Sequence, residues 1–144
     1  MSEISPAHVL LVEDNEGDII LTQEAFIESK IKVDLSVVRT GQEAIDFVFK
    51  KNNYYNVKRP DIILLDINIP IFSGHEVLEK IKEDQDLKRI PVIMLTTSSN
   101  QKDIEKSYHN NCNSYVQKPL EMESFIDAIL KIDEFWLQLS TLLK

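Results

Sequence analysis

Short apolar runs recur along the chain, and each is followed by a longer stretch with the spacing of an amphipathic helix. The runs have the length of β-strands and lie near residues 8–12, 33–38, 61–66, 91–96 and 113–117. The stretches between and after them predict five helices. These cover about residues 17–29 and 42–51, a segment that begins after Ser73, a segment near 101–110, and a long segment from about 122 to 142.

The helical spacing also predicts which side chains face the core. In the first three helices we expect these to be Ile20, Leu21, Ala25 and Phe26, then Ala44, Ile45, Val48 and Phe49, then Val77, Leu78 and Ile81. The fourth helix contains only Ile104 and Tyr108 as large apolar or aromatic residues, which indicates weak anchoring. Residues 52–59 are polar with two tyrosines, and we interpret them as a long loop that offers a contact surface.

Strict alternation of strands and helices predicts an α/β fold. Right-handed crossovers place helices on both faces of a parallel sheet, which is a doubly wound arrangement. Five strands suit the flavodoxin-like order 2-1-3-4-5, in which a crevice opens at the carboxyl ends of strands 1 and 3. We therefore expect a single domain over residues 1–144, with a core at 8–131 and a fifth helix that extends beyond it through 132–144.

Composition narrows the possible functions. The chain has 144 residues, of which 43% are apolar, and this fits one globular domain. Its 24 acids against 16 bases give a formal charge of -8, which opposes direct DNA binding. Cys112 is the single cysteine, so an internal disulfide is excluded. The start of the chain lacks signal-peptide features and no strand-like apolar run is long enough to span a membrane, so we expect a cytoplasmic protein.

Chemically capable side chains follow four of the five predicted strands. Glu13 and Asp14 follow strand 1, Asp66 ends strand 3, Thr96 ends strand 4, and Lys118 follows strand 5. The carboxyl ends of parallel strands meet at one edge of the sheet, where such folds bind ligands. These residues are therefore expected to form one site.

The three acids predict a cation site. Carboxylates within about 5 Å of each other repel by roughly 3 kcal/mol per pair at an effective dielectric near 20, and a bound cation offsets this repulsion. Mg²⁺ suits an oxygen-only loop site. We assign it to Asp14, Asp66 and a backbone carbonyl near Asn68, with Glu13 acting through water. Asp66 could then attack a phosphoryl group, while Thr96 and Lys118 contact that group from the other side. A cis peptide at Lys118-Pro119 would direct the ammonium inward.

Together these motifs resemble a response-regulator receiver domain, the phosphoaccepting module of two-component signalling. The resemblance covers residues 8 to about 131 and rests on Glu13-Asp14, Asp66, Thr96, Lys118-Pro119, and the loop signature Asp66-Ile67-Asn68-Ile69-Pro70 with Gly74. It implies that Asp66 accepts phosphate from a sensor histidine kinase and that Tyr115 is a switch aromatic. The face made by helix 4, strand 5 and helix 5 would change when Thr96 moves toward the phosphoryl group. Such a protein catalyses its own phosphorylation and slow dephosphorylation.

The end of the chain carries further apolar residues. Phe135, Trp136, Leu139 and Leu142 continue the fifth helix past the core, and an exposed apolar patch usually marks an interface. We expect a homodimer through helix 5 and this tail, with folding back onto the domain as the alternative. Within the family, the Phe-Trp tail and the long loop before strand 3 are similar to single-domain regulators paired with cyanobacterial or bacterial phytochrome kinases.

Two other functions compete with a signalling role. A magnesium phosphohydrolase could use Asp66 as its nucleophile, but enzymes of the haloacid dehalogenase type usually carry a second Asp two residues later, where this chain has Asn68. A flavin-binding protein is the other alternative. The acidic segment 13–18 would repel the phosphate of FMN rather than bind it.

Overall fold

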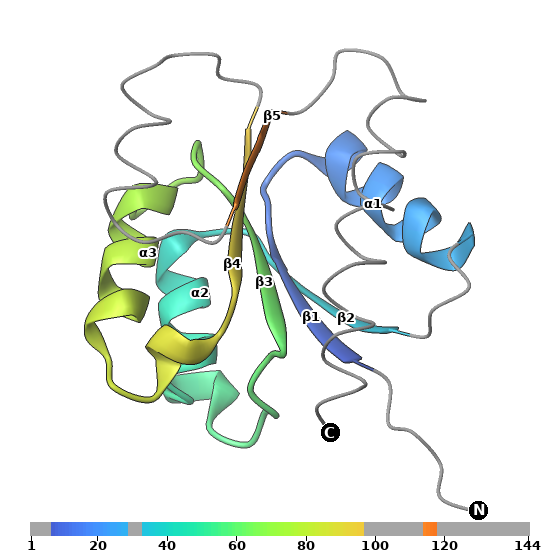
Figure 1. Ribbon diagram of the computed structural model, residues 1–144. Helices are drawn as coiled ribbons and strands as arrows, with labels where there is room; N and C mark the ends of the chain where they lie inside the picture. The colour runs from blue at the N-terminus through green and yellow to red at the C-terminus, as the bar shows by residue number, and fades with distance from the viewer. Residues whose placement is uncertain (1–6, 29–32, 97–113, 118–144) are drawn as a thin grey trace, which may run out of the picture.

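A five-stranded parallel sheet forms the centre of the computed structural model, which describes residues 7–28, 33–96 and 114–117 (Figure 1). The strand order is β2-β1-β3-β4-β5, so the predicted order is confirmed. The strands are β1 (Ala7–Val12), β2 (Val33–Val38), β3 (Ile62–Asp66), β4 (Val92–Thr96) and β5 (Ser114–Gln117). Each agrees with its predicted range to within one residue.

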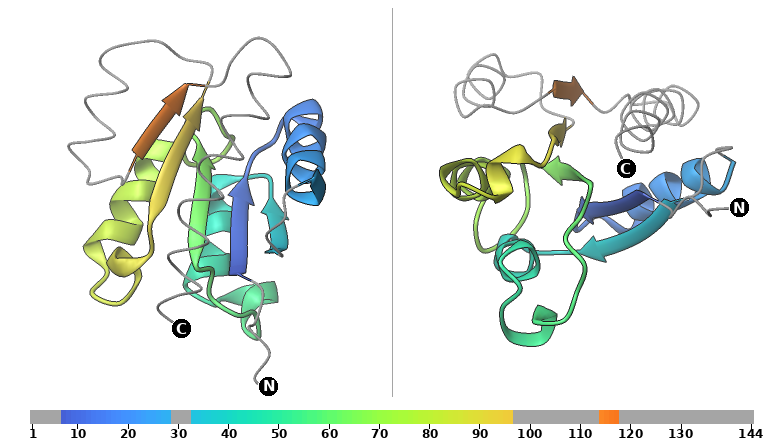
Figure 2. Two further views of the ribbon diagram at one scale, coloured as in Figure 1. Left: turned by 45° about the vertical axis from the view of Figure 1, so that its right-hand side comes forward. Right: turned by 60° about the horizontal axis from the view of Figure 1, so that its bottom comes forward.

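Helices cover both faces of this sheet. They are α1 (Glu16–Glu28), α2 (Gly41–Val48) and α3 (Gly74–Glu83), and two short 3₁₀ helices, η1 (Asn52–Tyr54) and η2 (Leu87–Arg89), follow α2 and α3. Figure 2 shows α1 on one side of the sheet and α2 with α3 on the other. The predicted fourth and fifth helices, including the extension 132–144, lie outside the described residues.

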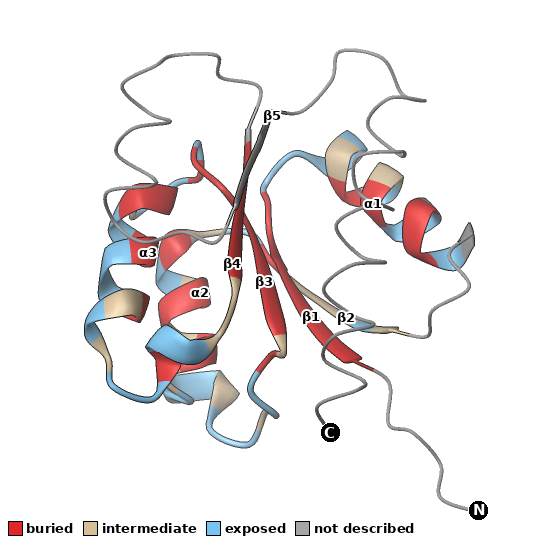
Figure 3. Cartoon of the chain, in the orientation of Figure 1, coloured by how far each residue is buried: buried red, intermediate tan, exposed pale blue. Residues whose placement is uncertain are grey.

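Alternate residues of the central strands supply two separate cores. Leu10 and Ile63 point to the side of α2 and α3, while Val9 and Leu64 point to the side of α1. Because helices cover both faces, every residue of β1 and β3 is buried, and both strands are largely apolar (Figure 3). The strand β2 lies at the sheet edge and is only partly buried.

Two helices begin with the same local sequence signal. The Thr40 hydroxyl oxygen accepts a hydrogen bond from the Glu43 N–H at 3.1 Å, and the Ser73 hydroxyl oxygen accepts one from the Glu76 N–H at 3.3 Å. Both follow the Ser/Thr-x-x-Glu pattern of helix starts, in which the side chain satisfies an otherwise unpaired backbone donor. These caps fix α2 and α3 at the carboxyl edge of the sheet.

The predicted inner face of α1 was wrong at one position. Ile20 is 45% exposed, whereas its neighbour Ile19 is 2% exposed and packs with Ala25 and Phe26. Thr22 completes the buried face, and its hydroxyl donates to the Asp18 carbonyl at 2.8 Å. A polar residue whose donor is satisfied within its own helix can thus stand where the apolar pattern expects a hydrophobic one.

The helix α2 ends earlier than predicted. Lys50 adopts a left-handed backbone with φ 58°, and the Lys51 N–H bonds back to the Asp46 carbonyl at 2.8 Å, which closes the helix. Phe47, which was not among the predicted core residues, is buried at 4% exposure. Phe49, which was, is only partly buried and packs at the margin of the same core.

The segment 52–59 contains η1 and is partly anchored. The Tyr54 ring lies 5.2 Å from the Phe47 ring, and its hydroxyl donates to a Glu43 carboxylate oxygen at 3.3 Å. Burial, together with the neighbouring negative charge of Glu43, raises the pKa of the Tyr54 phenol. Tyr55 is 74% exposed, so its side chain is accessible to a partner. That this segment forms a contact surface stays a prediction.

Candidate phosphoryl and metal site

Three carboxylates meet at the carboxyl edge of the sheet, as the sequence predicted. Ligand oxygens of Glu13, Asp14 and Asp66 all lie within 4.8 Å of one another. Asp66 is the last residue of β3, and the two other acids directly follow β1, the neighbouring strand. Within the part of the chain that the structure describes, no other group of His, Cys, Asp and Glu side chains converges in this way.

The three acids differ in exposure because the sheet holds them differently. Glu13 is 1% exposed and its N–H donates to the Val38 carbonyl of β2 at 3.0 Å, so it continues the pairing of β1 with β2. Asp66 is 8% exposed, while Asp14 is exposed. The cluster is therefore buried on the sheet side and open to solvent through Asp14.

The loop after Asp66 folds back against this carboxylate. The Asn68 N–H donates to Asp66 Oδ1 at 3.1 Å, and the Gly74 N–H donates to the Ile67 carbonyl at 2.9 Å. Ile67 and Ile69 are buried and hold the loop to the core, which leaves Asn68 exposed between them. The backbone of Asn68 is thus fixed beside the acidic cluster.

The electrostatics of the cluster fit a divalent cation. Two unit charges 4.8 Å apart repel by about 3 kcal/mol at an effective dielectric of 20, and three such pairs arise when all three carboxylates are ionised. All the available ligands are oxygens, which suits hard cations. The residues present therefore fit a divalent metal ion.

The predicted phosphate-contacting residues are only partly described. Thr96 ends β4, one residue beyond Leu95, which pairs with Asp66, so its backbone lies at the same edge of the sheet. Tyr115 lies in β5 opposite Met94. Lys118, with its predicted cis bond to Pro119, falls outside the described residues, as do the interface residues Phe135, Trp136, Leu139 and Leu142.

An ion pair at the rim of the site was not anticipated. The Arg39 guanidinium lies 2.8 Å from a Glu16 carboxylate oxygen, and the two side chains are 50% and 64% exposed. Such an exposed pair adds little to stability, about 0 to 1 kcal/mol. Arg39 directly follows β2, so the same strand-end rule that found Asp66 could have found this cation.

His8 and His75 are both buried outside the acidic cluster. His8 is 7% exposed, its ring nitrogens lie 2.8 Å from Ser36 Oγ and 3.3 Å from the Arg59 carbonyl oxygen, and its ring is 5.7 Å from that of Phe47. His75 is also buried, in the first turn of α3. Neither histidine belongs to the acidic cluster.

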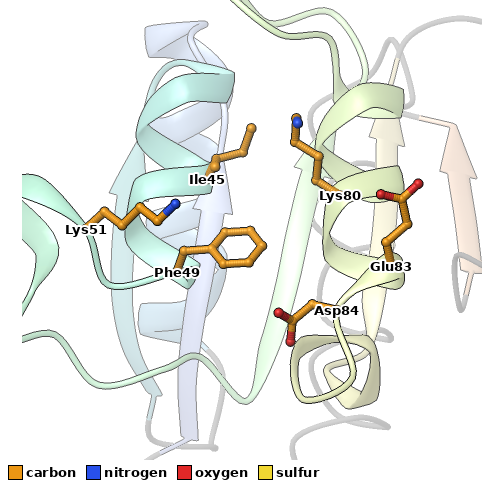
Figure 4. A pocket seen from close by; sticks show the side chains of 6 residues that line it. All are labelled: Ile45, Phe49, Lys51, Lys80, Glu83 and Asp84. Carbon is orange, nitrogen blue, oxygen red and sulfur yellow. The ribbon is translucent and has the colours of Figure 1, made fainter.

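A pocket of about 330 Å³ lies between the ends of α2 and α3 (Figure 4). It is lined by Ile45, Phe49, Lys51, Lys80, Glu83 and Asp84. The N–H groups of Leu87 and Asp86 bond the Asp84 carboxylate, which lowers its pKa. Because both helices start at the carboxyl edge of the sheet and run away from it, this pocket is remote from the acidic cluster.

Comparison with known proteins decides the family. The family model for the response regulator receiver domain matches residues 9–130, which include every described site residue. The chain belongs to this family. As a receiver domain it is a signalling module, and the family assignment gives no support to the phosphohydrolase alternative.

Several relatives of this receiver domain are phytochrome response regulators. The chain is 42% identical over 137 residues to the response regulator Rcp1 of Synechocystis sp. (strain ATCC 27184 / PCC 6803 / Kazusa), covering 95% of this chain and 93% of Rcp1. The crystal structure of the phosphorylated cyanobacterial phytochrome response regulator RcpA matches with a TM-score of 0.90 and 43% identity, over 92% of this chain and 95% of that one. The Mn²⁺-bound form of Rcp1 matches with a TM-score of 0.88 and 42% identity over the same shares. The predicted resemblance to phytochrome-linked regulators is therefore confirmed.

None of the helices in residues 7–28 and 33–96 is long and apolar enough to cross a bilayer.

Proposed function

We propose that this receiver domain accepts a phosphoryl group on Asp66 from a phosphohistidine of a sensor histidine kinase, with Mg²⁺ bound at the acidic cluster. One observation supports this most strongly. Asp66 ends a buried strand, and its carboxylate oxygen lies within 4.8 Å of carboxylate oxygens of Glu13 and Asp14. A carboxylate in that position can act as a nucleophile once its charge is balanced.

In the proposed reaction, a carboxylate oxygen of Asp66 attacks phosphorus. The bond from phosphorus to the imidazole nitrogen of the donor breaks, its electron pair stays on that nitrogen, and the leaving imidazole takes up a proton from solvent water. Bound Mg²⁺ supplies charge neutralisation for the phosphoryl oxygens. Asp14, Asp66 and the Asn68 carbonyl hold the ion in this scheme, and Glu13 acts through water.

The remaining predicted residues complete the proposal. Thr96 and Lys118 contact the phosphoryl oxygens, and Tyr115 responds to the movement of Thr96. The surface of helix 4, strand 5 and helix 5 then changes its affinity for a partner. Slow loss of phosphate to water follows from the absence of an acid at Asn68, the position that a hydrolase would use for acid/base catalysis.

The partner and assembly are proposed from the relatives and the sequence. Two structural relatives are a cyanobacterial phytochrome response regulator and a bacteriophytochrome response regulator, which supports a phytochrome as the kinase here. We propose a cytoplasmic homodimer through helix 5 and Phe135, Trp136, Leu139 and Leu142. The formal charge of -8 supports a regulator that acts through protein contacts rather than by direct DNA binding.

The test is phosphorylation by a small donor. The protein is incubated with Mg²⁺ and acetyl phosphate, and wild type, Asp66→Asn and Asp61→Asn are compared by intact mass. Asp61 precedes the same strand at its other end, so Asp61→Asn is a matched loss of one acid. We expect a base-labile phosphoryl group on wild type and Asp61→Asn and none on Asp66→Asn. Equal labelling of Asp66→Asn would overturn the proposal.

A further inference from the structure

The loop that carries Asn68 contains a strained residue. Ile71 has φ 64°, a left-handed backbone that β-branched residues rarely adopt, and its side chain is 65% exposed. Exposure of the side chain means that burial of Ile71 itself does not hold this conformation. The constraint must come from its neighbours.

Those neighbours both contact Gly41, the first residue of α2. The Gly41 N–H donates to the Pro70 carbonyl at 3.0 Å. On the other side of Ile71, the Phe72 backbone approaches so closely that a Cβ added to Gly41 would lie 2.3 Å from the Phe72 carbonyl oxygen. Gly41 therefore holds the loop immediately before and immediately after the strained residue.

Space rather than backbone conformation explains why position 41 is glycine. None of the described glycines has a positive φ, so an alanine could adopt the backbone of Gly41. An added methyl group would also lie 2.6 Å from Phe72 Cβ. The nearest atom is a backbone oxygen, and the backbone also fixes the position of Phe72 Cβ, so no side-chain rotation relieves the clash and the loop would have to move.

The ring of Phe72 fastens the loop at the same point. It is partly buried and packs against the core beneath α2 and α3. The Lys80 ammonium lies 5.9 Å from the centre of this ring. We call Gly41 and Phe72 together the clamp, because their contacts hold the loop on both sides of Ile71.

We propose that Gly41 is a positioning residue of the metal site: by clamping Pro70 and Phe72 around the strained Ile71, it keeps the backbone of Asn68 beside Asp66 and thereby raises the affinity for Mg²⁺. This inference rests on the proposed function, in which the Asn68 carbonyl binds the ion. Residues that orient metal ligands without touching the metal commonly affect its affinity strongly.

The first test compares Gly41→Ala with Gly17→Ala. Gly17 also lies at this edge of the sheet, in the first turn of α1, where an added Cβ would meet only the Asn15 Oδ1 atom at 3.3 Å. The measured quantity is the increase in unfolding free energy on adding Mg²⁺, which reports metal affinity separately from the stability of the metal-free fold. We expect the Mg²⁺ dissociation constant to rise roughly tenfold in Gly41→Ala and to stay near the wild-type value in Gly17→Ala.

A second pair of variants covers the case in which Gly41→Ala does not fold. Phe72→Ala and Phe49→Ala each remove a partly buried ring that packs on the same core, but only Phe72 lies in the loop. Both should lower the stability of the metal-free protein. We expect only Phe72→Ala to weaken Mg²⁺ binding.

Phosphorylation by acetyl phosphate supplies an independent reading. We expect Gly41→Ala and Phe72→Ala to need a higher Mg²⁺ concentration than wild type to reach half of their maximal phosphorylation rate. At high Mg²⁺ their labelling should be restored. If wild type were phosphorylated and these variants bound Mg²⁺ as tightly as wild type, the positioning role would be overturned. If wild type itself took no phosphate on Asp66, the proposed function would fail instead, and the two failures are therefore distinguishable.

Discussion

Asp66 illustrates how far single residues could be assigned from the sequence. Its place at a strand end, with Glu13 and Asp14 at the end of the adjacent strand, follows from the rule that parallel strands end at one edge, and the structure brings the three together. The contact of Gly41 with Phe72 could not be predicted in this way. It joins residues far apart in sequence, and it depends on the packing of α2 against the loop before α3.

Ile71 offers a prediction at the same scale. Asparagine tolerates the left-handed backbone better than a β-branched residue, and the side chain at this position is mostly exposed. Ile71→Asn should therefore raise the free energy of unfolding by about 1 kcal/mol in urea denaturation without Mg²⁺. The control is Ile27→Asn, which replaces an isoleucine that is 81% exposed in the regular helix α1 and should give no gain. A loss of stability in Ile71→Asn would show that the isoleucine itself holds the loop.

Among the elements, the apolar runs predicted all five strands, since each run ends on a polar residue or is directly followed by one. Helix faces were predicted less well. In α1 the buried isoleucine is Ile19 and not the predicted Ile20, so the predicted inner face was shifted by one residue. The two isoleucines are adjacent and equally apolar, so the apolar pattern does not distinguish them. In α2 the end was misplaced because the left-handed Lys50 carries none of the Gly or Asn signals that usually mark a helix end.

The cap of α3 can be tested directly. Ser73→Ala removes the acceptor for the Glu76 N–H and should lower the free energy of unfolding by about 1 kcal/mol, while Ser73→Thr keeps the acceptor and should lose much less. Thermal or urea denaturation of the three proteins measures this difference. Equal losses in both variants would mean that packing at Ser73, rather than capping, stabilises the start of the helix.

In the whole molecule, the fold determines where the site can lie. The sheet is buried on both faces by helices, so its carboxyl edge is where polar chemistry can face solvent, and the acidic cluster lies there. The relatives are matched over nearly their whole length, which agrees with a receiver module of this size. Predictions for helix 4, helix 5 and the dimer interface depend on residues outside those described, and binding measurements must test them.

In the proposed function, Asp66 accepts phosphate and holds it, rather than passing it on to water in rapid turnover. The most direct measurement loads the protein with Mg²⁺ and acetyl phosphate, removes the donor, and follows both intact mass and released phosphate over time, with peptide mapping of the labelled residue. We predict one phosphoryl group per chain, located on the peptide that contains Asp66 and lost slowly. Phosphate on another residue, or rapid and repeated release of phosphate while donor is present, would rule out this role of Asp66.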